Sequence, residues 1–230
     1  MTRFAFVLAA TLAIMFAAGP GHARDGAAAT VRVVDGDTIE VDGQVVDLAG
    51  IDAPEPGQLC HSAGFDWHCG LVAAYELRKR IALSGPGIRC TPEIGGTASD
   101  TPGDPVRAEC WVGDSSLASD QIRSGLGVTS EDAPERLVHD ETFARQAGLG
   151  IWGGRFVPPA DWRAGVRLDG GVPDVDRDCV LVGDPDRNGR PDRYLSILDA
   201  DYEQALGDIA AGLAVRLCSD EAARAAGWHR

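Results

Sequence analysis

The chain has 230 residues and a formal net charge of −14, from 35 acidic residues against 21 lysines and arginines. Such a charge repels polyanions, so nucleic acid is disfavoured as a partner unless a local basic groove overrides the overall field. The length allows one domain of ordinary size and a smaller second unit.

Residues 1–23 have the pattern of a secretory signal peptide. Arg3 is followed by an apolar run from Phe4 to Ala18 and by small residues up to Ala23. The run is short for a membrane span, although an uncleaved anchor is the alternative. We therefore expect a secreted or periplasmic monomer that has no membrane partner after cleavage.

The stretch Val33–Pro56 alternates apolar and polar residues with the period of half-buried strands, and Asp-Gly pairs at 35–36 and 42–43 predict tight turns. Four carboxylates fall at the strand ends: Asp35, Asp37, Asp52 and Glu55. Oxygen ligands crowded in this way favour a hard divalent cation. An acidic hairpin with Asp at its turns is the simpler interpretation.

Beyond this stretch, apolar periodicity and breakers predict the remaining elements. A surface loop is expected at Ile94–Asp104. Helices and strands are expected at Cys69–Leu83, Ile88–Cys90, Val106–Val112, Leu117–Ser124 and Pro134–Gly148.

A linker at 166–178 precedes a small C-terminal unit, residues 179–230. Here we expect strands at Cys179–Val182 and near Tyr194–Leu198, then a helix around Glu203–Ala214. The loop Asp184–Asp192 matches the first nine positions of an EF-hand-like loop, which makes it a weak second calcium candidate. Its twelfth position is Leu195 instead of a bidentate Glu, so a plain Asx-rich turn is favoured.

Six cysteines in an exported chain predict disulfides, with fifteen pairings from the count alone. Zinc is an alternative for the first pair, because His61 and His68 adjoin Cys60 and Cys69. Adjacent ligands give poor tetrahedral geometry, so a disulfide is favoured.

VVDGDTIEV followed by LAGIDAPEP resembles the staphylococcal-nuclease-like (thermonuclease) family, and the likeness extends from Ala29 to Trp162. It implies an α+β fold for 29–165: a five-stranded OB-type Greek-key barrel with three packed helices. The end of the chain resembles a small Cys-containing module ending in AAGW, closed by a disulfide. The expected buried residues are Val33, Ile39, Val41, Leu48 and Ile51. The expected pairs are Cys60–Cys69, Cys90–Cys110 and Cys179–Cys218.

The resemblance also implies a calcium-dependent phosphodiester hydrolase. Asp37, Asp52 and the Ala53 carbonyl match the family's Ca²⁺ ligands, and Glu55 matches its general base. Two arginines normally clamp the phosphate in such a site.

Both arginine positions are substituted: Asp47 and Pro105 occupy them. Arg107 is a candidate stand-in, displaced by two residues, which is about 7 Å along a strand. The family's stacking tyrosines also lack a counterpart at Val128–Ser130. A carboxylate at Asp47 would repel the phosphate by about 4 kcal/mol per unit charge at about 4 Å.

We therefore predict an exported nuclease-like protein with impaired catalysis, serving as a binding or structural module. The alternative is an active, slow, Ca²⁺-dependent endonuclease on DNA or RNA that recruits Arg107, Arg78 or Arg89. A guanidinium within reach of Glu55 and the Asp37/Asp52 pair would favour the alternative.

Overall fold

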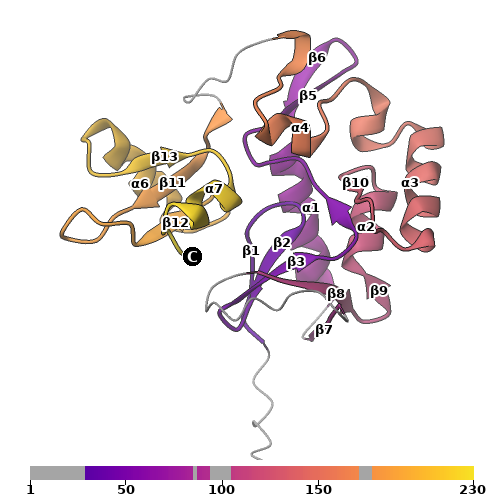
Figure 1. Cartoon of the computed structure of the whole chain (residues 1–230), viewed down its shortest axis with the longest axis horizontal. Helices are drawn as coiled ribbons and strands as arrows, with labels where there is room; N and C mark the ends of the chain where they lie inside the picture. Colours follow the sequence, from indigo (N-terminus) through magenta and orange to yellow (C-terminus); the bar gives the residue numbers. More distant parts are fainter. Residues whose placement is uncertain (1–28, 85–86, 94–104, 171–177) are drawn as a thin grey trace, which may run out of the picture.

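A computed structural model describes residues 29–84, 87–93, 105–170 and 178–230. It shows a mixed α+β body beside a smaller C-terminal unit (Figure 1). The predicted signal peptide, the predicted loop 94–104 and most of the predicted linker lie outside the described residues. No helix in the described ranges is both long enough and apolar enough to cross a bilayer.

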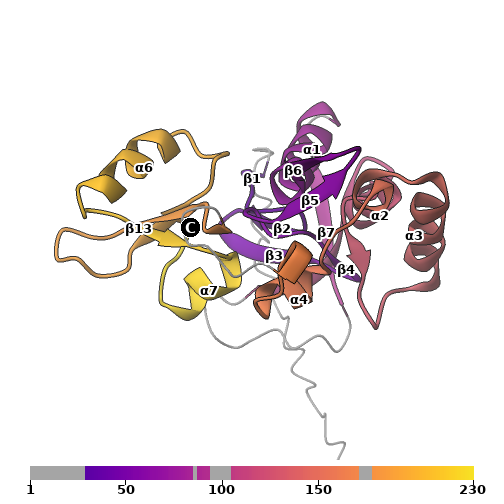
Figure 2. The same cartoon turned by 90° about the horizontal axis from the view of Figure 1, so that it is seen from above.

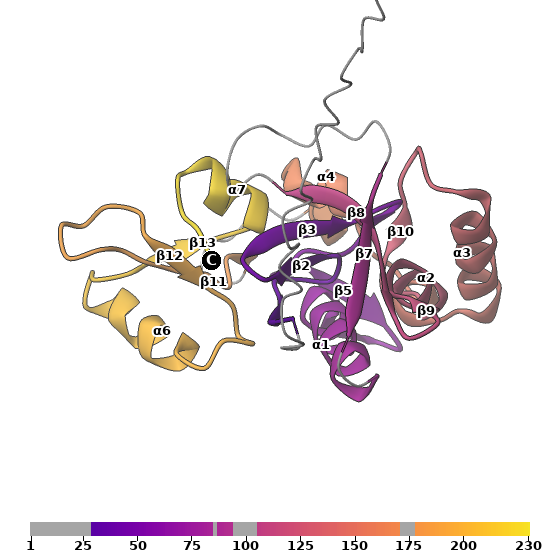
Figure 3. The ribbon, with the colours of Figure 1, turned by 90° about the horizontal axis from the view of Figure 1, so that it is seen from below.

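The main sheet has the strand order β1-β2-β3-β8-β7, with β9 paired to β8. All neighbours are antiparallel except β3 and β8, which are parallel. The sheet curls into a half-barrel (Figure 3). The strands are β1 (Val31–Val33), β2 (Thr38–Val41), β3 (Gln44–Leu48), β7 (Ile88–Pro92), β8 (Val106–Val112) and β9 (Ser115–Ser116).

The turn between β2 and β3 is formed by Asp42 and Gly43, whose φ angles are 50° and 83°. Two consecutive left-handed residues suit the twist of a two-residue hairpin, which explains the Asp-Gly pair. A second pairing joins β4 (Ile51–Asp52) to β10 (Val128–Thr129). It fixes Asp52 at the rim of the body.

Three predicted helices are confirmed: α1 (Cys69–Leu83), α2 (Leu117–Arg123) and α3 (Glu135–Ala147). A 3₁₀ turn, η1 (Gly150–Gly153), and the short helix α4 (Pro159–Arg163) follow them, and η2 is Leu168–Gly170. The helices bury the apolar face of the sheet in one core. This core includes Val33, Ile39, Leu48, Ile51, Leu77, Leu117, Ile122 and Leu137.

The expected burial is confirmed for Val33, Ile39, Leu48 and Ile51. The prediction that Val41 is buried is wrong, because its side chain is only partly buried at the edge of this core. It is the last residue before the Asp42-Gly43 turn, so it lies at the end of the hairpin.

All three expected disulfides are present: Cys60–Cys69, Cys90–Cys110 and Cys179–Cys218. Cys90 and Cys110 are register partners on β7 and β8. Cys60 lies on β5 (Leu59–Ser62), which pairs with β6 (Phe65–His68), and Cys69 begins α1. The zinc alternative is wrong, because both of its thiolates are consumed in a disulfide. Three disulfides fit folding in an oxidising extracellular or periplasmic compartment.

The C-terminal unit is a three-stranded sheet in the order β12-β11-β13, with two helices. Its elements are β11 (Leu181–Asp184), β12 (Arg193–Leu195), α6 (Tyr202–Ala210), β13 (Val215–Leu217) and α7 (Asp220–Ala225). The sequence analysis predicted the first strand, β11, two residues too early, and it predicted a helix that extends beyond the end of α6. It missed β13 and α7, which are too short to show a clear apolar period.

Arg230 joins the two units. Its guanidinium pairs with Asp199 at 2.9 Å and donates to the carbonyl oxygens of Val33 and Val34 at 3.4 Å. Only 1% of this side chain is exposed. Arg32 of β1 also lies 3.7 Å from Asp199. These contacts hold the C-terminal unit against β1, next to the acidic turn.

Candidate functional site

The acidic turn between β1 and β2 is organised by Asp35. Its carboxylate accepts the backbone N–H groups of Asp37 at 3.1 Å and Thr38 at 2.8 Å. Asp37 in turn accepts the N–H of Ala53 at 2.6 Å, which ties this turn to the end of β4. A Cβ at Gly36 would lie 2.7 Å from the Cβ atoms of Ala53 and Ala73, so the approach requires glycine. The DGD turn and the IDAPEP turn therefore pack directly on each other and are joined by a hydrogen bond.

Two hydrogen bonds to the buried Gln58 fix the backbone of Glu55. The Glu55 backbone N–H donates to the Gln58 side-chain oxygen, and the Gln58 backbone N–H donates to the Glu55 carbonyl oxygen at 2.8 Å. A Cβ at Gly70, in the first turn of α1, would lie 1.7 Å from the same carbonyl oxygen. Glycine thus lets α1 pack directly on the backbone of Glu55. The side chain itself is 9% exposed.

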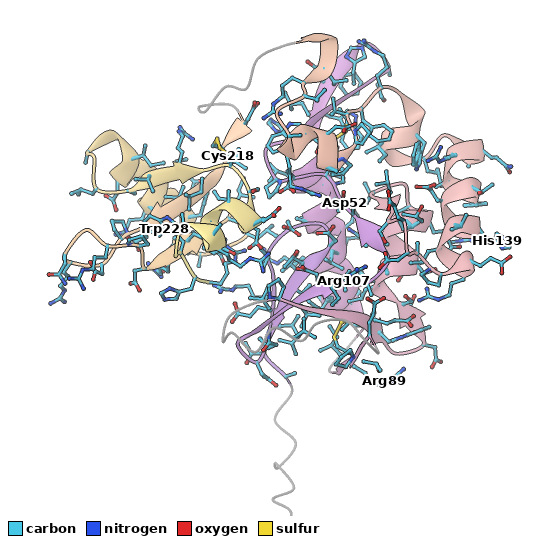
Figure 4. All side chains as sticks on the ribbon, viewed as in Figure 1. Asp52, Arg89, Arg107, His139, Cys218 and Trp228 are labelled. Atoms are coloured by element: carbon cyan, nitrogen blue, oxygen red, sulfur yellow. A yellow bond between two sulfur atoms is a disulfide. The ribbon has the colours of Figure 1, made fainter. Side chains whose placement is uncertain are left out.

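One cavity of about 430 Å³ collects these carboxylates. Of the described residues, seven acidic side chains and three arginines line it. They are Asp35, Asp37, Asp47, Asp52, Glu55, Asp220 and Glu221, with Arg107, Arg163 and Arg224. Figure 4 labels two of the lining residues, Asp52 and Arg107. The fold therefore brings together the predicted acids, Asp47, Pro105 and Arg107.

Arg163, at the end of α4, is a cavity residue that the sequence did not reveal, as are Asp220, Glu221 and Arg224 of α7. Its Nη1 lies 2.9 Å from Asp52 Oδ1 and 2.8 Å from Glu55 Oε1, and its Nη2 lies 3.2 Å from Asp52 Oδ2. Burial works to lower the pKa of this guanidinium, but the hydrogen bonds to the two carboxylates raise it overall. No local signal in the segment PADWR predicts this placement, because the partners lie more than 100 residues away.

Two of the acids have strongly raised pKa values. Burial, and then the negative charge of Asp35, raises the pKa of Glu55 to about 8, although Arg163 opposes this. Burial and Asp35 also raise the pKa of Asp37 well above its usual range. Both shifts come first from burial of the carboxyl group and second from repulsion by the neighbouring Asp35.

Asp47 has partners on three sides. It accepts the Thr38 hydroxyl at 3.1 Å, and it is the register partner of Arg107 on the parallel strand β8. Burial raises its pKa, whereas the charge of Arg224 works in the opposite direction. Arg107 itself pairs with Asp132 at 2.9 Å and 3.2 Å. Asp47 is thus a partly compensated carboxylate.

In this structure the carboxylates of the predicted calcium site are bound to donors of the protein itself. Both oxygens of Asp52 are bound to Arg163, and Asp37 Oδ2 is bound to the Ala53 N–H. Within the described ranges, no three His, Cys, Asp or Glu side chains form a group that could hold a metal ion. The residues shown therefore support a site in which a guanidinium neutralises the acids.

The other predicted cation site and the other candidate arginines lie outside this cavity. In the loop Asp184–Asp192, Asp186 accepts the backbone N–H groups of Asn188 and Arg190, as in an Asx turn, and Asp184 pairs with Arg193. Arg78 donates to the Leu198 carbonyl at 3.3 Å, and Arg89 lies on β7. Neither arginine approaches Glu55 through a described contact.

The C-terminal unit contributes α7 residues to the lining of the cavity. Figure 2 shows α7 beside α4 and β3. Glu221 lies 3.8 Å from Arg163, and Arg224 forms an ion pair with Asp220. Burial, and then the charge of Asp35, raises the pKa of Asp220 to about 7. The site is thus shared between the two units.

No protein-family model matches this chain. The chain is 29% identical, over 153 residues, to the succinoglycan biosynthesis protein ExoI of Rhizobium meliloti (strain 1021). The similarity covers 63% of this chain and 74% of that protein.

Proposed function

We propose that this chain is an exported nuclease-like protein whose cavity has lost calcium-dependent phosphodiester hydrolysis and acts as a binding module. The proposal includes an OB-type barrel for residues 29–165. The β1-β2-β3-β8-β7 order, the curled sheet and the three helices support that architecture. The disulfides and the signal-peptide pattern support export.

Arg163 lies within reach of Glu55 and Asp52, as the active alternative requires, but it is bound to their carboxylate oxygens, and this binding carries the proposal. A metal ion needs the Asp52 oxygens, and a general base needs a carboxylate that can accept a proton from water. In this arrangement Arg163 binds both oxygens of Asp52 and one of Glu55. The Arg163 guanidinium is thus the cation that neutralises Asp52 and Glu55. Hydrolysis would require Arg163 to move away from both carboxylates.

The charge of the cavity also opposes a phosphodiester chain. Of the described lining residues, seven are acidic and three are arginines. Two phosphate-clamping positions of the family hold Asp47 and Pro105. Phosphoryl-transfer arginines contribute about 10³–10⁵ in rate, so their loss alone would leave little activity.

Hydrolysis of DNA or RNA is the second candidate function, and the position of Arg163 favours it. The Arg163 guanidinium lies within hydrogen-bond distance of Glu55. The sequence analysis expects such a guanidinium in an active nuclease site. A carboxylate with a pKa of about 8 has the basicity of a good general base once it is deprotonated. Arg163 and Arg107 would then supply positive charge to the phosphate.

Cleavage assays separate the two functions. Single-stranded DNA and RNA would be incubated with the unaltered protein and with Glu55→Gln, each with Ca²⁺ and with chelator. We expect equal, background cleavage of each nucleic acid in all four combinations of protein and condition. Calcium-dependent cleavage by the unaltered protein that disappears in Glu55→Gln would overturn the proposal and establish the hydrolase.

A rescue experiment tests why the site is silent. The variants Asp47→Arg, alone and with Pro105→Arg, restore the family's positive charges. Partial nuclease activity in the double variant that is lost on adding Glu55→Gln would show that Asp47 and Pro105 cause the loss of activity. No activity in the double variant, but activity after a further Arg163→Gln, would assign it to Arg163.

A further inference from the structure

Two buried carboxylates each keep one oxygen free at the wall of the cavity. Glu55 and Asp35 are only 7% and 6% exposed, and both line the cavity. Arg163 binds Oε1 of Glu55, and two backbone N–H groups bind Oδ1 of Asp35. Within the described ranges, no N–H or hydroxyl group donates to Glu55 Oε2 or Asp35 Oδ2, and both atoms keep accessible surface. Each side chain therefore presents an unused acceptor to the cavity.

The charge of the wall requires a donor that is a cation. The seven acids and three arginines among the described lining residues leave a formal excess of four negative charges. Arg107 contributes less than a full charge to the cavity, because it is bound to Asp132, which is not a lining residue. Such a wall attracts cations and repels oxyanions.

Arg163 shows which chemical group these acids bind. Its guanidinium, a nitrogen cation with several N–H donors, is bound to Asp52 and to one oxygen of Glu55. A second nitrogen cation can use the remaining oxygen of Glu55 without displacing Arg163. An ammonium group has three N–H donors, which is enough for the free oxygens of both Glu55 and Asp35.

The size and the apolar part of the cavity indicate more than a single ion. A volume of about 430 Å³ is typical of sites for small organic molecules. Leu48, Ile51 and Pro105 line it together with the acids, and they offer a surface for a short alkyl chain. In the described ranges the acids do not converge as metal ligands do, whereas N–H donors accept such separated oxygens.

We propose that the cavity binds a small aliphatic amine, whose ammonium group is held by the free oxygens of Glu55 and Asp35 and whose alkyl chain lies against Leu48 and Ile51. This inference rests on the proposed binding function and adds the ligand class. It also gives the excess of acids a role that the loss of hydrolysis leaves unexplained.

The test is isothermal titration calorimetry on the full chain at physiological ionic strength. The probes are the diamine putrescine, its uncharged counterpart butanediol, and Ca²⁺. The titrations are run at about pH 9, where Glu55 is ionised and an alkylammonium group, with a pKa near that of lysine at about 10.4, is still charged. We expect putrescine to bind at one site, and butanediol to bind at least about tenfold more weakly.

Two isosteric variants locate the ammonium group. Glu55→Gln and Asp35→Asn each remove one charge and keep the shape, and Asn keeps an acceptor for the backbone N–H groups of the turn. Each should weaken putrescine binding at least about tenfold, because a charge-assisted hydrogen bond is lost. Glu203→Gln is the matched control, since it removes the same charge from an exposed position outside the cavity and should bind normally.

Arg163→Gln gives a result that a merely structural role of these acids would not produce. It removes the internal cation that shares Asp52 and Glu55 with the ligand, so putrescine should bind several-fold more tightly. Arg187→Gln removes the same charge from an exposed position and should leave the affinity unchanged. Circular dichroism checks that each variant is folded.

The inference would be overturned if putrescine does not bind, if butanediol binds equally well, or if Glu55→Gln and Asp35→Asn both keep the unaltered affinity. Binding of Ca²⁺ without binding of putrescine would overturn it in favour of a metal site. Calcium-dependent DNA cleavage would instead overturn the proposed function and leave the putrescine measurements standing. Putrescine binding that depends on both acids, without cleavage, would support both.

Discussion

The two ends of the cavity use the same residue type in opposite ways. Arg163, at the end formed by the acidic turns, is bound to Asp52 and Glu55 by three hydrogen bonds. Arg224, at the end formed by the C-terminal unit, pairs with Asp220 alone and has two buried nitrogens without a partner in the described chain.

This difference indicates which arginine contributes more to stability. A satisfied guanidinium neutralises neighbouring carboxylates and contributes to folding. An unsatisfied one has lost its hydration without compensation and contributes less. The comparison predicts unequal effects when the arginines are removed.

The largest effect should come from Arg230, which fixes the two ends relative to each other. Arg230→Met removes the closer of the two arginines beside the buried Asp199 and leaves Arg32 at 3.7 Å, and breaking a buried ion pair costs about 3–5 kcal/mol. The free energy of unfolding would be measured by urea denaturation. Arg187→Gln, the exposed control, should change it by less than about 0.5 kcal/mol. A loss below about 1 kcal/mol for Arg230→Met would contradict this role.

Arg163→Gln should have the next largest effect. It leaves Asp52 and the buried Glu55 without positive charge, but 30% of the Arg163 side chain is exposed, which reduces the penalty. We expect a loss of about 2–3 kcal/mol at neutral pH, below the value for a fully buried pair. The same denaturation measurement checks this. Partial recovery in the double variant Arg163→Gln/Asp52→Asn should follow, because Asp52 is the carboxylate that loses both of its hydrogen bonds to Arg163.

The pH dependence of stability should sharpen the comparison at the Arg163 end. The folded pKa of Glu55 is raised to about 8 from 4.5, so between these values the unfolded chain has released a proton that the folded chain retains. The contribution of Glu55 to the free energy of unfolding is fully present below about pH 4.5 and is lost as pH rises through about 8. The free energy of unfolding falls by at most about 1.4 kcal/mol per pH unit in this range. Glu55→Gln should flatten the curve. Identical curves for both proteins would contradict the shift.

Arg224→Gln should have the smallest effect on stability. It removes one ion pair but also removes two unsatisfied donors, so we expect a change below about 1 kcal/mol. Asp220 can remain neutral after the substitution, because its pKa is already raised to about 7. A loss as large as that of Arg163→Gln would show that Arg224 is a structural residue.

The turns and the main helices were accessible from the sequence because each depends on nearby residues or on pattern, whereas the disulfide pairs followed from the resemblance. Asp-Gly pairs specify tight turns, and apolar periodicity specifies α1 and α3. The resemblance then placed Asp37, Asp52 and Glu55 together, and the cavity contains all three. Val41 shows the limit of the pattern, since alternation does not report where a hairpin end leaves the core.

What the sequence by itself determined is therefore the set of carboxylates and the turns that present them. The tertiary structure alone decided which positive charges meet those carboxylates. Arg163 reaches Glu55 across 108 residues of chain, and Arg224 reaches the cavity because Arg230 and Asp199 hold the C-terminal unit against β1. Long side chains on short helices carry no local signal of their partners, because ion pairing depends on distance in space and not on spacing along the chain.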